Sequence, residues 1–142
     1  MDRALGYLGI AQKAGFLTTG ADNCGTVVRA GKAKLLMLAS DAAENACRRA
    51  EGVVYGRKTP LIKLPFDKDT LSAVTGKPGC TMLCLTDIGL ASHFAAALRE
   101  TDPQFAELCA ALEEKEHRAR QRKAEAASHE RNRKVGKRRN KA

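Results

Sequence analysis

The chain has 142 residues, a length that fits one domain with an extension. Hydrophobic residues make up 44% of it, but only 4% are aromatic and none is Trp, so the core must be aliphatic. The formal net charge of +9 favours an anionic partner, most commonly a nucleic acid. The sequence has neither a signal-peptide pattern nor the run of about 18 apolar residues that a membrane span needs. We therefore expect a cytoplasmic monomer that does not bind membranes.

The first part of the chain alternates helix and strand signals. Residues 3–15 place apolar side chains on one helical face and end in a glycine, which predicts a helix. The stretch FLTTG (16–20) predicts a short edge strand or a turn. Residues 21–31 predict a second helix, closed by Gly31. The continuous apolar run KLLMLA (34–39) is typical of a strand that is covered on both faces.

The alternation continues to residue 100. Residues 40–54 predict a helix, and TPLIKLP (59–65) predicts a strand that lies near a sheet edge because prolines flank it. Residues 67–76 predict a short helix. The run CTMLCLTD (80–87) predicts a second buried strand, and residues 88–100 predict a helix that could run on past the proline that follows. Strands interleaved with helices indicate an α/β fold, which we expect to be a three-layer α/β/α sandwich around a small mixed four-stranded sheet.

Polar residues at the predicted helix starts are candidate caps. Ser40 or Asp41 could cap the helix over 40–54, and Asp67 or Asp69 the helix that follows the 59–65 strand.

The charge is concentrated at the C-terminus. Residues 1–112 carry a net charge of +2, whereas residues 113–142 carry +7. We therefore divide the chain into a globular domain over 1–112 and a basic tail over 113–142, which is helical or disordered. The tail either acts only as a solubilising segment or clamps RNA phosphates without regard to sequence. The phosphate contacts would come from Arg131, Arg133, Lys134, Lys137, Arg138, Arg139 and Lys141.

The five cysteines indicate neither a metal site nor a disulfide framework. Cys80 and Cys84 are four residues apart in a predicted strand, where they would share one face, and metal knuckles prefer two intervening residues. We expect the cysteines to be small core residues. No cysteine–histidine pair or Ser–His–Asp order suggests catalysis. We therefore expect a non-enzymatic protein without metal or cofactor.

Two stretches resemble a known family. LGIAQKAGFLTTGADNCGTVVRAGKAKLLMLASDAAEN and TGKPGCTMLCLTDIGLA resemble the kink-turn RNA-binding ribosomal-protein superfamily of the L-seven-Ae type, with bacterial YlxQ-like proteins closest. The resemblance covers about residues 3 to 100. It implies an α/β/α sandwich that binds structured RNA, associated with the ribosome or its RNA.

The resemblance also implies where RNA binds. In the family the second helix opens with Gly, any residue, Asn, Glu, two more residues and Lys, and the polar trio reads the sheared G·A pairs beside an RNA kink. In this chain Asp22, Asn23 and Thr26 occupy the positions of the trio, so all three depart from the pattern. The predicted RNA-binding residues are Gly20, Asp22, Asn23, Thr26, Lys32, Lys77, Pro78 and Gly79.

Other interpretations remain open at this point. Asp22 or Asn23 could simply cap the helix, since polar first turns are common. The domain could be a protein-interaction adaptor whose basic tail alone contacts RNA. It could also present RNA to an RNA-modifying enzyme.

Overall fold

The structure is a computed structural model that describes residues 3–140, with side chains to residue 130 and the backbone alone beyond it. The elements in chain order are α1 (Arg3–Ala14), β1 (Leu17–Thr19), α2 (Ala21–Arg29), β2 (Leu35–Leu38), α3 (Glu44–Val54), β3 (Leu61–Lys63), α4 (Lys68–Thr75), β4 (Met82–Leu85), α5 (Ile88–Thr101), the 3-10 turn η1 (Pro103–Phe105) and α6 (Ala106–Asn140). Within this range, no helix combines the length and the apolar character that a membrane span requires.

The four strands form one mixed sheet in the order β1-β4-β2-β3. β4 runs antiparallel to both of its neighbours, and β2 pairs with β3 in parallel. The two continuous apolar runs are thus the central strands, and the two short strands are the edges. The predicted fold class, a three-layer sandwich around a small mixed sheet, is confirmed.

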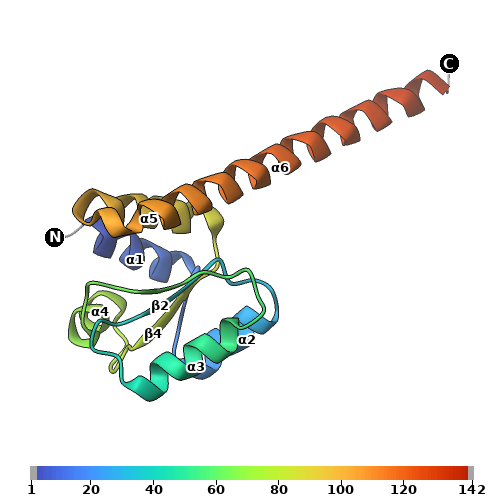
Figure 1. Ribbon diagram of the computed structural model, residues 1–142. Helices are drawn as coiled ribbons and strands as arrows, with labels where there is room; N and C mark the ends of the chain where they lie inside the picture. The colour runs from blue at the N-terminus through green and yellow to red at the C-terminus, as the bar shows by residue number, and fades with distance from the viewer. Residues whose placement is uncertain (1–2, 141–142) are drawn as a thin grey trace.

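Alternate side chains of the central strands enter two separate cores. In β2, Leu35 and Met37 face one core, while Leu36 and Leu38 face the other. The first core is closed by α1, α4, α5 and the start of α6, and the second by α2 and α3, as Figure 1 shows. Because a strand alternates its side chains between faces, burial on both faces requires the unbroken apolar runs seen in the sequence.

α6 belongs partly to the body of the protein and partly to solvent. Pro103 lies in the turn that separates α5 from α6. The helix predicted over residues 88–100 therefore ends before this proline and does not continue past it. Phe105, Cys109 and Leu112 are buried in the first core, while residues 117–130 are exposed. α6 therefore crosses the predicted boundary at residue 112 as one continuous helix and projects away from the body (Figure 1).

The capping predictions were half right. Asp67 accepts a hydrogen bond from the backbone N–H of Thr70 at 2.8 Å and caps α4. The prediction that Ser40 or Asp41 caps α3 is wrong, because that helix begins at Glu44 after an uncapped Ala43. Asp41 instead accepts a hydrogen bond from the backbone N–H of Lys68 at 2.9 Å, which links the segment before α3 to the first residue of α4.

The predicted common face for two cysteines is also wrong. Cys80 lies before β4 begins, in the first core, whereas Cys84 lies within β4 and faces the second core. The period-two rule fails here because Cys80 still belongs to the loop that leads into the strand. Four of the five cysteines are buried as expected, and Cys47 is half-buried.

Candidate nucleic-acid interface

The start of α2 is a bare helix end. Gly20 precedes the helix with φ 92° and ψ 146°, a region of backbone space that is almost exclusive to glycine. Its N–H donates to the carbonyl oxygen of Met82 at 3.0 Å, which ties the helix start to the beginning of β4. No side chain caps the helix. The first-turn N–H groups, which have no acceptor within a helix, therefore point outward and give this end a partial positive charge.

The three polar side chains of this end are exposed but engaged within the protein. Asp22 forms an ion pair with Arg49 of α3, although the Asp22 side chain is 90% exposed. Asn23 donates to the carbonyl oxygen of Thr19 at 3.2 Å, and the Thr26 hydroxyl donates to that of Asp22 at 3.1 Å. Neither Asp22 nor Asn23 is the cap, so the capping interpretation is wrong for both.

Arg49 was missed by the sequence analysis. It lies 27 residues beyond Asp22 in the chain, and the packing of α3 against α2 brings it there. Its side chain is 53% exposed, so its charge is available to solvent at the α2 start. No local pattern around Arg49 indicates this placement. The Arg49 guanidinium supplies a positive charge at the α2 start, where the family pattern has a lysine and this chain has the uncharged Thr26.

The loop of Lys77, Pro78 and Gly79 lies at the same end of the sheet as Gly20. Gly79 is three residues before Met82, so its Cα is at most about 11 Å from the residue that bonds Gly20. Ser72 and Thr75 of α4 brace the loop: their side-chain oxygens accept from the backbone N–H groups of Cys80 at 3.1 Å and Lys77 at 3.3 Å. The three loop residues are exposed.

Among the RNA-binding residues predicted within residues 1–112, Lys32 lies away from the α2 start. It follows the C-terminal end of α2, and the nine residues of that helix span about 13 Å. The structure thus brings Gly20, Asp22, Asn23 and the 77–79 loop to one end and separates Lys32 from them. The tail contacts predicted at Arg131, Arg133, Lys134, Lys137, Arg138, Arg139 and Lys141 lie outside the residues whose side chains the structure describes.

Two buried thiols, Cys24 of α2 and Cys84 of β4, lie in the core between α2 and the sheet. Burial raises the pKa of both Cys24 and Cys84 to about 12. The Cys24 thiol donates to the carbonyl oxygen of Thr18 at 3.5 Å. Both thiols are fully buried in the second core, so these residues act in packing. Within the part of the chain that the structure describes, no group of three or more His, Cys, Asp or Glu side chains could hold a metal ion.

Comparison with known proteins decides the family. No family model matches the chain. The chain is 30% identical over 76 residues to the RNA-binding protein YlxQ of Enterococcus faecium, a match that covers 54% of this chain and 73% of that protein. The chain belongs to the YlxQ family of L-seven-Ae-type proteins. The stretches that carried the resemblance in the sequence thus identified the family correctly.

Two solved structures share the fold of this YlxQ-family chain. A protein with unknown function from Bacillus halodurans C superposes with a TM-score of 0.64 at 23% identity, covering 69% of this chain and 98% of that one. The 15.5kD RNA binding protein of Giardia lamblia superposes with a TM-score of 0.57 at 16% identity, covering 68% of this chain and 82% of that one. At these identities the likeness shows the fold alone.

Proposed function

We propose that this YlxQ-family protein is a non-enzymatic RNA-binding protein whose α2 start and 77–79 loop bind structured RNA. The observation that carries the proposal is the uncapped, exposed first turn of α2 behind Gly20, in a chain whose relative is named an RNA-binding protein. Outward N–H groups and the helix dipole suit phosphate oxygens. The absence of a Cβ at Gly20 allows a nucleic-acid backbone to approach closely.

Each polar group at the α2 start has a separate role in this proposal. Asn23 can donate and accept at a base edge once it leaves Thr19. Asp22 would accept from the N–H edge of guanine, and the phosphate that Asp22 repels would be met by Arg49. Lys77 would reach the backbone from the opposite side of the bound RNA.

We further propose that a standard kink-turn is bound with weak or altered selectivity. The family trio is replaced by Asp22, Asn23 and Thr26, and each of the three already has a partner inside the protein. Base reading at this face must therefore compete with intramolecular contacts. We place the target among structured RNAs of the ribosome, which co-sedimentation with ribosomal subunits and sequencing of crosslinked cellular RNA would test.

The test of the binding face is RNA titration beside thermal melts. Asn23→Ala should lose about 1–3 kcal/mol of recognition of structured RNA. Asn23→Arg should keep affinity through its charge while losing selectivity. Lys77→Ala should weaken binding with little change in melting temperature, because the side chain is exposed.

Matched controls lie away from this end or on the other face of the sheet. Lys13→Ala changes an exposed lysine in the last turn of α1, which leads into β1 at the Leu85 end of β4. Gln104→Ala changes an exposed amide of η1, which packs with α5 and α6. Neither should alter RNA affinity. If the Asn23 and Lys77 variants bind structured RNA as tightly and selectively as the native protein, the α2 start is not the interface.

A further inference from the structure

A basic groove lies at the other end of the sheet from the α2 start, between the body and α6. It has a volume of about 520 Å³ and is open to solvent. Its position follows from Lys34, whose backbone N–H donates to the carbonyl oxygen of Leu85 at the end of β4, at 2.8 Å. Gly20, by contrast, bonds Met82 at the beginning of that strand. The two surfaces thus lie at opposite ends of β4.

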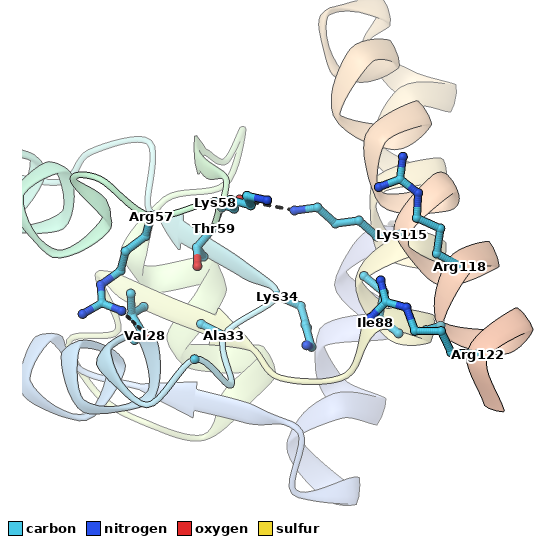
Figure 2. Close-up of a pocket in the computed structure, with 12 residues that line it drawn as sticks. Val28, Ala33, Lys34, Arg57, Lys58, Thr59, Ile88, Lys115, Arg118 and Arg122 are labelled. Atoms are coloured by element: carbon cyan, nitrogen blue, oxygen red, sulfur yellow. Dashed lines mark hydrogen bonds between the residues drawn. The ribbon is translucent and has the colours of Figure 1, made fainter. Parts of the chain in front are cut away.

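Half of the residues that line the groove are cations, and none of them is acidic. They come from three separate segments: the approach to β2, the loop between α3 and β3, and α6. The six are Lys34, Arg57, Lys58, Lys115, Arg118 and Arg122. Spacings of three and four residues put the three α6 cations on one face of the helix, the face toward the body (Figure 2).

Two of these cations form hydrogen bonds that connect the segments lining the groove. The Arg57 guanidinium donates to the carbonyl oxygen of Val28 at 3.3 Å, near the C-terminal end of α2. Lys115 Nζ donates to the carbonyl oxygen of Lys58 at 3.2 Å and joins α6 to the α3–β3 loop (Figure 2). The walls of the groove are therefore linked to each other before any ligand binds.

Three other cations remain uncompensated. Among the residues that the structure describes, no hydrogen bond or ion pair engages the side chains of Lys34, Lys58 or Arg122. Lys34 from the body and Arg122 from α6 extend into the space between the two walls (Figure 2). Arg118 pairs with Glu114, but that pair is exposed and adds little stability. Gathering like charges without counter-charge is unfavourable, and a polyanion in the groove would relieve it.

We propose that this groove is a second RNA-binding site, which holds the sugar–phosphate backbone of a single-stranded segment. The inference goes beyond the proposed function because it adds an RNA contact at the opposite end of the sheet. Phosphates placed among Lys34, Lys58 and Arg122 would form charge-assisted hydrogen bonds and release counterions.

An exposed aromatic side chain favours a single strand over a duplex. Tyr55 is 88% exposed and precedes Arg57 by two residues, so their Cα atoms are at most about 7 Å apart. Bases of a single strand are free to stack on such a ring, whereas bases of a duplex are not. A membrane surface fits less well, because the apolar residues Val28 and Ala33 in the groove are buried and cannot enter a bilayer.

The test uses the full chain, oligouridine as an unstructured probe, and two matched double variants. Lys34→Gln with Arg122→Gln removes two groove cations. Lys63→Gln with Lys123→Gln removes the same charge from exposed positions outside the groove. The log–log dependence of affinity on salt should flatten by about 1.4 in the first variant, two phosphates at roughly 0.7 each, and by less in the second. Equal changes in the two variants would overturn the proposal, since bulk charge alone would explain them.

Two further variants separate charge from shape and stacking. Lys34→Arg with Arg122→Lys keeps both charges and should keep oligouridine affinity, which excludes misfolding as the cause of a loss. Tyr55→Leu should lower affinity without changing the salt slope, and Tyr55→Phe should retain it. An unchanged affinity in Tyr55→Leu, with a duplex bound as tightly as oligouridine, would overturn the single-strand assignment.

The experiment also distinguishes this site from the α2 interface. Asn23→Ala should alter the preference for structured RNA and leave the oligouridine salt slope intact, while the groove double variant should do the converse. If the groove double variant loses binding to phosphatidylglycerol vesicles and keeps its RNA binding, the groove is a lipid site and the RNA proposal is wrong.

Discussion

The two ends of α2 present different chemistry. Its first turn offers outward N–H groups, one amide and a carboxylate held by Arg49, a mixed surface that suits base edges and the shape of a folded RNA. Its C-terminal end borders a groove lined by six cations and no acid, a surface that suits phosphates of any sequence. One small sheet thus separates a surface suited to selectivity from a surface suited to affinity.

The largest expected effect comes from shortening α6 at two different points. Deleting residues 113–142 removes a net charge of +7 together with three groove cations, while deleting 124–142 removes +5 and leaves the groove intact. Both truncations should weaken RNA binding. The longer deletion should flatten the salt dependence further, by roughly 0.7 for each phosphate that the groove no longer binds.

Fluorescence titration of oligouridine over a range of salt concentrations would measure these slopes, with melts to check folding. Equal slopes for the two truncations would mean that the basic groove makes no contribution. A slope unchanged from the native value in both would remove the whole of residues 113–142 from RNA binding.

The next effect concerns the backbone at the α2 start. Gly20→Ala forces a side chain into a conformation that nearly only glycine adopts, so it should destabilise the fold by about 1–3 kcal/mol. Gly52→Ala, on the exposed face of α3 with open space around the new methyl group, should instead stabilise it by about 0.5–1 kcal/mol. Urea unfolding of both variants measures the two changes. A neutral Gly20→Ala would show that the strained turn is not needed to present the helix end.

A smaller and opposite effect should follow from restoring the family trio. Asp22→Asn, Asn23→Glu and Thr26→Lys together should raise affinity for a kinked RNA relative to a plain duplex, and should free Arg49 from its ion pair. The groove double variant, assayed beside it, should not change this preference. Tight and selective binding of a standard kink-turn by the native protein would show that the substitutions do not weaken recognition.

The last prediction, with no effect on RNA binding at neutral pH, concerns the buried thiols Cys24 and Cys84 in the core between α2 and the sheet. Burial holds the pKa of the Cys24 and Cys84 thiols near 12, above the ordinary value of 9.0, so the folded state binds these protons more tightly than the unfolded state. Stability contributed by the two thiols is therefore complete below pH 9 and is lost as the pH rises toward 12.

At neutral pH a thiol reagent should modify the half-buried Cys47 first and reach the buried thiols only on unfolding. Mass spectrometry after brief labelling would identify the modified residues. Early labelling of Cys24 in a variant of the α2 start or of the groove would show that the substitution loosens α2 itself. The RNA affinity of that variant would then reflect the loosened helix and not a lost RNA contact.

The strands and most helix boundaries could be predicted because their signals are local. KLLMLA and CTMLCLTD contain unbroken apolar runs that only burial on both faces explains, and the structure places them at the centre of the sheet. The caps were less predictable. Asp67 caps α4, whereas Asp41 serves a neighbouring helix, since a side-chain acceptor binds whichever N–H the tertiary structure brings to it.

The candidate site was also predictable only where its residues are close together in the sequence. Gly20 and Asn23 belong to one short stretch, so a pattern could point to them. Arg49 joins them only because α3 packs against α2, and the basic groove is assembled from segments near residues 34, 58 and 118. A linear sequence holds no signal for such a convergence.

The sequence by itself determined the fold class, the family, the aliphatic core and the basic bias of the C-terminal segment, because each depends on periodicity, composition or a continuous motif. Only the tertiary structure decided which charges meet. The pairing of Asp22 with Arg49, the separation of Lys32 from the α2 start, and the groove between α6 and the body all depend on how rigid elements pack. The energy of a charge pair depends on the distance between the two charges in space, and residues far apart in the sequence come within a few ångströms of each other only when the chain folds.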